Sequence, residues 1–176
     1  MKIFFVRHGQ TNYNVLGLCN EMPNKDVKLT EKGVKQAEEV SDKLKDTTID
    51  LVITSELFRT IQTANIITNN NKIQAKVEAR LNDTKTGIEG QKVSDYLESI
   101  KKDPIKTRPK NGESFLDYKK RVYEFLNDLK ELDYETILVV AHCDTLKIIN
   151  GYFNKLSDKE MYNTTIHNCQ VLEFEI

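Results

Sequence analysis

The sequence predicts an α/β fold: a three-layer αβα sandwich with a mostly parallel sheet and an antiparallel strand near one edge. Short apolar runs alternate along the chain with longer stretches whose apolar residues recur at helical spacing. This alternation is typical of crossover units, in which each helix covers the sheet formed by the strands on either side of it. The length of 176 residues fits a single domain over residues 1–176.

Five apolar runs are predicted to be strands. Residues 3–6 and 136–141 are nearly continuous apolar runs, of the kind that fills a buried parallel sheet. The other three strands are residues 50–54, 73–79 and 170–175. The Asn-rich run at 69–71 indicates a turn from helix to strand.

Four stretches are predicted to be helices: residues 31–45, 56–68, 114–132 and 145–153. Each carries apolar residues three or four positions apart, which places them on one face. Thr30 is placed to cap the first helix, and Ser114 with Asp117 reads as a capping box that starts the third. Residues 83–112 are the least periodic, and we expect irregular structure there, over the site.

Composition narrows the class of protein. A formal net charge of −1 leaves no basic footprint, so no nucleic-acid partner is expected. No apolar stretch reaches the length of a membrane span, and the chain enters a strand at once, so neither a membrane partner nor a signal peptide is expected. The three cysteines (Cys19, Cys143 and Cys169) are odd in number and widely spaced, which favours the reducing cytoplasm over a disulfide framework.

Polar side chains follow the predicted strands at the point where each strand ends. They are Arg7 and His8 after the first strand, Ser55 and Arg59 after the second, Asp83 after the third and His142 after the fourth. If these strands are parallel, the side chains converge at the carboxyl edge of the sheet, where such folds bind ligands. The set suits phosphoryl transfer, because cations neutralise phosphate oxygens, a histidine attacks phosphorus and an acid protonates the leaving oxygen.

Five blocks of sequence carry a resemblance to a known family. They are Arg7-His8-Gly9-Gln10-Thr11-x-x-Asn14, Leu29-Thr30-Glu31-Lys32-Gly33-x-x-Gln36-Ala37, Ser55-Glu56-Leu57-x-Arg59-Thr60-x-x-Thr63-Ala64, Gly112-Glu113-Ser114 and Val139-Val140-Ala141-His142. In this order, and nearly from end to end, the chain resembles the histidine phosphatase superfamily, in its phosphoglycerate-mutase-like branch and of the broad-specificity phosphatase type.

The resemblance implies roles for individual residues. His8 would be the nucleophile that becomes phosphohistidine, and neighbouring cations would keep it neutral by depressing its pKa. The implied phosphate pocket consists of Arg7, Arg59 and His142, with Asn14 and Thr11 at its rim. Neither a metal nor an organic cofactor is implied.

The general acid is the main departure from the family pattern. The family usually has a glutamate after the third strand, where this chain has Asp83. Aspartate is shorter by one methylene, about 1.5 Å of reach, and a misplacement of about 1 Å costs on the order of 10²-fold in rate. We expect Asp83 to be the acid, with Glu89 as the alternative.

Two further departures concern the substrate pocket and the second histidine. Leu18-Cys19-Asn20-Glu21 stands where the family has a polar Arg-x-Gln-Gly pattern, so the substrate is expected to be unusual. Cys143 replaces the glycine after the second histidine, and His-Cys also begins the signature of cysteine-dependent phosphatases. That signature needs an arginine six residues later, where this chain has Ile149, so Cys143 is interpreted as a small buried residue.

Two other interpretations stay open. His142 is either a pocket residue or a cap of the following helix. The basic run 106–110 is either a solvated loop or an attractor for a second anionic group of the substrate.

The expected function is hydrolysis of small phosphomonoesters, with a small phosphorylated metabolite as partner and a monomer or homodimer as the functional unit. The resemblance also implies that mutases of the family are longer chains, with extra segments that shield the site. The length of 176 residues therefore favours a phosphatase. The alternatives are a phosphoglycerate-type mutase or phosphotransferase, and a catalytically weak phospholigand-binding protein.

Overall fold

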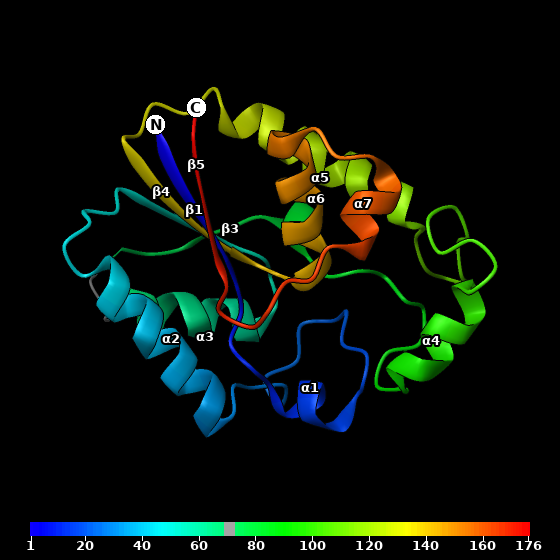
Figure 1. Cartoon of the computed structure of the whole chain (residues 1–176). Helices are drawn as coiled ribbons and strands as arrows, with labels where there is room; N and C mark the ends of the chain where they lie inside the picture. The colour runs from blue at the N-terminus through cyan, green and yellow to red at the C-terminus, as the bar shows by residue number, and fades with distance from the viewer. Residues whose placement is uncertain (69–72) are drawn as a thin grey trace.

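The computed structural model describes residues 1–68 and 73–176, so the turn predicted at 69–71 lies outside the described residues. Its centre is a five-stranded sheet in the order β3-β2-β4-β1-β5 (Figure 1). The strands are β1 (Lys2–Arg7), β2 (Leu51–Thr54), β3 (Lys76–Val77), β4 (Thr136–Ala141) and β5 (Val171–Glu175). The first four pair in parallel, and β5 runs antiparallel to β1. The mostly parallel sheet with an antiparallel edge strand is confirmed.

Four helices cover the sheet in two layers. Helices α2 (Glu31–Leu44) and α3 (Phe58–Ile67) lie on one side of the strands, and α5 (Phe115–Leu129) and α6 (Cys143–Asn154) lie on the other (Figure 1). Alternation along the strands explains the two layers. Phe4 of β1 packs with α2 and α3, whereas its neighbour in sequence, Phe5, packs with α5 and α6. The αβα sandwich is confirmed.

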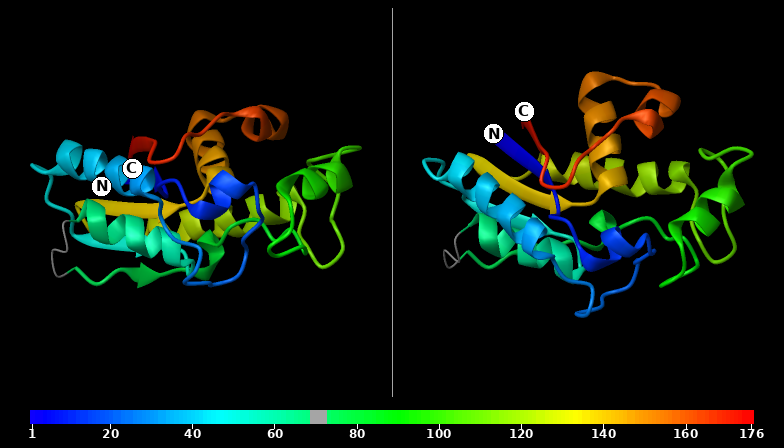
Figure 2. Two further views of the ribbon diagram at one scale, coloured as in Figure 1. Left: turned by 90° about the horizontal axis from the view of Figure 1, so that it is seen from below. Right: turned by 60° about the horizontal axis from the view of Figure 1, so that its bottom comes forward.

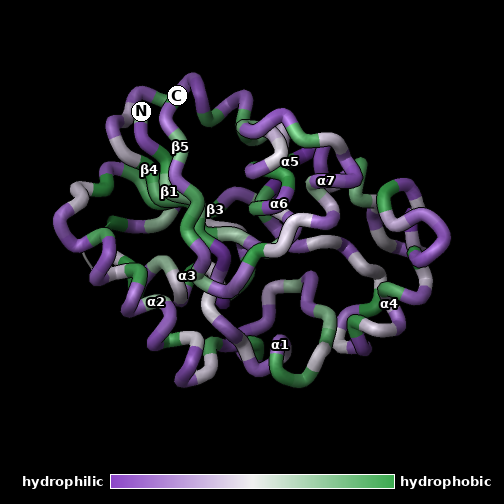
Figure 3. The backbone as a smooth tube through the Cα atoms, in the orientation of Figure 1, coloured by the Kyte–Doolittle hydropathy of each residue, from purple (hydrophilic) through white to green (hydrophobic). Residues whose placement is uncertain are grey.

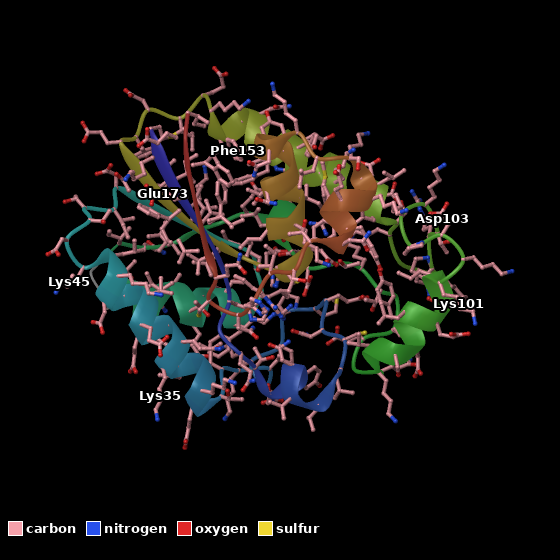
Figure 4. All side chains as sticks on the ribbon, viewed as in Figure 1. Lys35, Lys45, Lys101, Asp103, Phe153 and Glu173 are labelled. Atoms are coloured by element: carbon pink, nitrogen blue, oxygen red, sulfur yellow. The ribbon has the colours of Figure 1, made fainter. Side chains whose placement is uncertain are left out.

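The predicted caps are present at two of these helices. Thr30 accepts a hydrogen bond from the Gly33 N–H at the start of α2, and Ser114 with Asp117 forms a capping box at the start of α5. The strands are largely apolar along the backbone tube (Figure 3), while side chains such as Lys35 and Lys101 point away from the molecule (Figure 4). Within the described ranges, no helix combines the length and the apolar character needed to span a membrane.

Three shorter helices and a 3₁₀ turn complete the described structure: α1 (Asn12–Leu16), η1 (Ala79–Leu81), α4 (Val93–Ile100) and α7 (Asp158–Asn163). Both views in Figure 2 place α4 at the opposite end of the molecule from α2. The expectation of irregular structure in 83–112 is confirmed for residues 83–92 and 101–112, and α4 is the exception. Val93, Leu97 and Ile100 recur at helical spacing, a short signal set between two aperiodic stretches.

The third strand is much shorter than the predicted 73–79. Only Lys76 and Val77 pair with β2, and both side chains are exposed because β3 is an edge strand. The next residue, Glu78, caps η1 by accepting the Arg80 N–H, which ends the extended backbone. The helix expected at 145–153 is longer than predicted and begins directly after His142.

Two glycines fix the turn that follows β1. A Cβ atom at Gly9 would lie 2.4 Å from the Gly33 carbonyl oxygen, and one at Gly33 would lie 2.1 Å from the Gln10 carbonyl oxygen. The turn and the first turn of α2 therefore touch backbone to backbone, which a side chain at either position would prevent. The Gly9 N–H also donates to Oγ1 of Thr63 at 3.1 Å, so α3 holds the same turn.

Candidate active site

The side chains predicted at the carboxyl edge of the sheet come together in the structure. His8, Arg59 and His142 are buried, with 2%, 3% and 0% of their surface exposed. Arg59 lines a cavity of about 420 Å³, a size typical of small-molecule sites, whereas His8 and His142 are not among the lining residues and contact Arg59 and Asp83 at its wall. The predicted residues that line it are Arg7, Thr11, Asn14, Arg59 and Asp83. The rings of the two histidines lie 5.3 Å apart, centroid to centroid.

The hydrogen bonds of His8 define its tautomer. Nδ1 lies 2.7 Å from the Gly9 carbonyl oxygen, which only accepts, so Nδ1 carries the proton. Nε2 lies 3.1 Å from Nε of Arg59, which only donates, so Nε2 is the acceptor. The Nε2 lone pair of His8 is therefore turned toward the guanidinium of Arg59.

The environment of His8 favours its neutral form. Burial is the main cause that holds the pKa of His8 well below its usual value, followed by the charge of Arg59, and then by His142 and Arg7. A neutral imidazole keeps the lone pair that a nucleophile needs. The prediction that neighbouring cations depress this pKa agrees with the geometry, although burial contributes more.

A chain of hydrogen bonds through two hydroxyl groups holds His142 at its Nε2 atom. Thr60 donates its proton to a carbonyl of its own turn, the Leu57 oxygen at 2.8 Å, so it accepts from Oγ of Ser55 at 2.9 Å. Ser55 must then accept from Nε2 of His142, 2.8 Å away. Within the described part of the chain, Nδ1 has no hydrogen-bond partner, and it lies 3.5 Å from Oδ2 of Asp83. His142 occupies the N-cap position of α6 but makes no capping bond with its side chain.

The two pocket arginines differ in how they are held. Arg59 donates from Nη2 to Asp83 at 2.8 Å and to the Asn20 carbonyl at 3.1 Å, and from Nη1 to the Asn20 side chain. Arg7 donates from Nη1 to the Ile166 carbonyl at 2.7 Å, while its buried Nε has no partner among the residues that the structure describes. Thr11 and Asn14 form the capping box of α1 at the edge of the cavity.

Of the two candidate acids, only Asp83 lies at the histidines. Its Oδ2 contacts Arg59, and its Oδ1 accepts the N–H of Thr84 at 2.9 Å. Glu89 is outside the cavity, where Oε1 accepts from the Asn20 amide at 2.8 Å and Oε2 from the Glu21 N–H at 2.6 Å. Glu89 therefore braces the loop that carries Asn20.

A family model described as the histidine phosphatase superfamily (branch 1) matches residues 3–176, which is nearly the whole chain. The chain belongs to the histidine phosphatase superfamily. The resemblance carried by the five sequence blocks is confirmed.

Individual relatives of this histidine phosphatase have varied names. It is 29% identical to the adenosylcobalamin/alpha-ribazole phosphatase of Escherichia coli, over 85% of this chain and 77% of that protein. It is 25% identical to a 2,3-bisphosphoglycerate-dependent phosphoglycerate mutase of Thermoplasma acidophilum, over 100% and 88%. The crystal structure of an alpha-ribazole phosphatase from Shigella flexneri superposes with a TM-score of 0.90 at 26% identity, covering 100% of this chain and 91% of that one.

Beyond the phosphate end, eight apolar or aromatic side chains line the cavity of this histidine phosphatase: Tyr13, Leu18, Val27, Val93, Tyr96, Leu97, Phe115 and Tyr162. Thr84, Thr86 and Asp144 add polar groups to the same walls. Among the described residues, Lys147 is the one cation of the lining besides the two arginines, and its Nζ lies 2.9 Å from Asp144. The basic run 106–110 does not line the cavity, and Arg108 pairs with Asp117 at 2.7 Å.

Sequence reasoning missed the loop that closes the cavity at Asn20. Glu21 accepts from the N–H groups of Thr86 and Gly87, while Glu89 accepts from the segment around Glu21. Two carboxylates therefore join the loop around Asn20 to the loop around Thr86. Glu21 binds from the first loop to the second, and Glu89 binds from the second loop to the first. The sequence did indicate this loop, because Leu18-Cys19-Asn20-Glu21 departs from the family pattern, but it did not predict which residues the loop contacts.

Cys143 lines the cavity without the surroundings of a cysteine nucleophile. Burial is the main cause that raises the pKa of its thiol, so the thiolate is disfavoured. Its Sγ lies 3.7 Å from the Ile166 carbonyl oxygen. Ile149, six residues on, is part of the hydrophobic core, so the position where a cysteine phosphatase needs an arginine holds an apolar side chain.

Proposed function

We propose that this histidine phosphatase hydrolyses small phosphomonoesters through a phosphohistidine formed on Nε2 of His8. The tautomer of His8 supports the proposal most directly, because the Gly9 carbonyl and the Arg59 guanidinium together leave the lone pair on Nε2, the ring nitrogen that contacts the cavity-lining Arg59. A neutral, oriented imidazole beside two guanidinium groups suits in-line attack on phosphorus.

The phosphate is proposed to bind next to hydrogen-bond donors of the pocket that are free to contact its oxygens. Nε of Arg7 is buried and has no partner in the described ranges, and the Nη atoms of Arg59 can exchange Asn20 and Asp83 for phosphate oxygens. Nδ1 of His142, which has no partner within residues 1–68 and 73–176, is unprotonated in the neutral ring and can accept a hydrogen bond from a protonated phosphate oxygen. Arginine suits this task because its planar fork matches phosphate oxygens.

The proposed reaction has two steps. In the first, Nε2 of His8 forms a bond to phosphorus while the bond to the ester oxygen breaks, and Asp83 gives its proton to that oxygen. In the second, water attacks the phosphohistidine, Asp83 takes a proton from the water, and His8 is released as inorganic phosphate forms. Arg7 and Arg59 neutralise the equatorial oxygens in both steps.

The charge of the rest of the cavity favours hydrolysis over phosphoryl return to a second substrate. A mutase of the phosphoglycerate type must hold a leaving group with further anionic groups. Here Lys147 is neutralised by Asp144, and eight of the other lining side chains are apolar or aromatic. The substrate that fits is a phosphomonoester of a neutral alcohol with an apolar or aromatic portion.

The free state of Cys19, Cys143 and Cys169 supports the proposed cytoplasmic location, because thiols persist in reducing compartments.

A phosphoester panel tests the function. The purified protein is incubated with phosphoserine, 3-phosphoglycerate, alpha-ribazole phosphate and sugar phosphates, and free phosphate and isomerised products are measured. We expect free phosphate and, after a rapid alkaline quench, phosphohistidine at position 8. Isomerised product without free phosphate would establish the mutase, and phosphoenzyme without turnover would establish the weak phospholigand-binding protein.

A further inference from the structure

Arg121 of α5 uses both Nη atoms of its guanidinium to hold the backbone around Asp83. Nη1 donates to the carbonyl oxygens of Arg80 at 2.6 Å and Asn82 at 2.8 Å. Nη2 donates to the carbonyl oxygen of Asp83 at 3.2 Å. Three carbonyls from four consecutive residues thus converge on one side chain that lies about forty positions further along the chain.

The guanidinium itself has little freedom to move. Its plane lies over the Tyr118 ring, 3.8 Å from the centroid, and Nε and Nη2 bind both carboxylate oxygens of Glu113 at 3.1 and 2.6 Å. Tyr118 is fully buried, and its hydroxyl is bound to Thr145 at 2.6 Å. A stacked, bidentate arginine loses little rotamer entropy for each hydrogen bond that it forms.

Glu113 extends the hold to the other side of Asp83. Its Oε1 accepts the N–H of Lys85 at 2.9 Å, and its own N–H donates to the Lys85 carbonyl at 2.9 Å. The backbone is therefore fixed at 80, 82 and 83 by Arg121 and at 85 by Glu113. We refer to Arg121, Glu113 and Tyr118 as the α5 clamp.

The position of the Asp83 carboxylate depends on this backbone. An aspartate carboxylate is a single methylene away from Cα, so a displacement of its backbone moves the acid group almost as far. In the structure that group lies 2.8 Å from Nη2 of Arg59 and 3.5 Å from Nδ1 of His142. A shift of about 1 Å would break both contacts and would lower a rate by on the order of 10²-fold.

We propose that Arg121 is a positioning residue for Asp83, and that the α5 clamp sets the reach of the proton donor toward the ester oxygen. This inference rests on the proposed function. If Arg121 had only a structural role, its replacement would lower the activity on all esters alike. A positioning role predicts instead a loss of activity that depends on the leaving group. An alkoxide needs a proton as it leaves, whereas an activated aryl oxide leaves without one.

The test compares Arg121→Lys with the wild type on two esters, an alkyl phosphate and p-nitrophenyl phosphate. Lysine keeps the charge but loses the planar fork. We expect kcat/KM for the alkyl ester to fall by about 10²-fold and that for the aryl ester by less than about fivefold. Arg108→Lys is the matched control, because Arg108 also pairs with a carboxylate, that of Asp117, but lies at the surface, and it should change the rate with neither ester.

A second variant, Glu113→Gln, tests the same proposal if Arg121→Lys does not fold. It weakens the grip on Arg121 and should give a smaller loss of the same leaving-group dependence. Circular dichroism and thermal melting identify the folded variants. Equal losses on both esters in the folded variants, or no loss on either, would overturn the inference. A wild type that releases phosphate from neither ester would instead overturn the proposed function.

Discussion

Nε of Arg59 donates a hydrogen bond to Nε2 of His8 at 3.1 Å. This contact joins the residue that directly follows β1 to the first turn of α3, which follows β2 and lies fifty-one positions later in the chain. It selects the tautomer of His8 and places a cation beside the proposed nucleophile. The same guanidinium reaches Asp83, so the proposed nucleophile, phosphate binder and acid form one connected group.

The first prediction concerns the nucleophile. His8→Gln should abolish phosphate release and phosphoenzyme formation, because binding energy cannot replace the atom that forms the covalent bond. The variant should remain folded by circular dichroism. His167→Gln is the matched control, since His167 is exposed and outside the cavity, and it should keep full activity. Activity of His8→Gln within about tenfold of the wild type would remove His8 from its role.

The second prediction concerns Asp83 and Glu89. Asp83→Asn should slow alkyl esters far more than aryl esters, because the alkoxide then leaves without a proton, and phosphoenzyme should accumulate with aryl substrates. Glu89→Gln should loosen the Asn20 loop and affect both ester classes alike. Parallel steady-state assays decide between them. Leaving-group dependence only in Glu89→Gln would transfer the acid role to Glu89.

The third prediction concerns stability against pH. Burial and the Arg59 charge hold the pKa values of His8 and His142 well below their usual range, so both stay neutral in the folded protein. In the unfolded chain they take up protons below about pH 6.5. The free energy of unfolding should therefore fall with decreasing pH, by up to about 1.4 kcal/mol per pH unit for each histidine.

Urea unfolding between about pH 7 and about pH 5 measures this slope. The window lies above the range in which carboxylates with lowered pKa values, such as Glu78 and Asp117, lose their contribution. His8→Gln should reduce the slope. A free energy of unfolding that stays level across the window would contradict the buried, neutral state of the histidines.

The fourth prediction concerns Gly33. Alanine is a better helix former than glycine by about 1 kcal/mol, but a Cβ here would meet the Gln10 carbonyl oxygen at 2.1 Å. Gly33→Ala should therefore lower the free energy of unfolding, by about 1–3 kcal/mol, through overpacking. Lys35→Ala, at an exposed position of the same helix, is the control and should change stability little. Urea unfolding at neutral pH gives both values.

The fifth prediction concerns metals and phosphate analogues. Within residues 1–68 and 73–176, no group of three or more His, Cys, Asp or Glu side chains is arranged to hold a metal ion. Activity should survive excess chelator, and vanadate should inhibit by occupying the pocket of Arg7, Arg59 and His142. Activity that is lost with chelator and restored by an added divalent ion would contradict the proposed mechanism.

Much of the fold follows from local patterns. The apolar runs of β1 and β4 are strong enough to identify a buried parallel sheet, and the strands' carboxyl ends meet at one edge whatever the details of the loops. His8 and His142 were therefore predictable neighbours, because each follows directly on one of these strands. Arg59 was predictable in the same way, since it lies in the first turn of α3 after β2.

Contacts between distant loops could not be predicted in this way. The sequence left Asp83 and Glu89 as alternatives, and the tertiary structure separates them because the Asn20 loop packs on the segment that contains Glu89. It also turns Arg121, which sequence reasoning read only as part of a helix, into the group that holds the Asp83 backbone. Residue spacing defines which face of an element is buried, whereas the distance between side chains forty positions apart depends on how the elements pack.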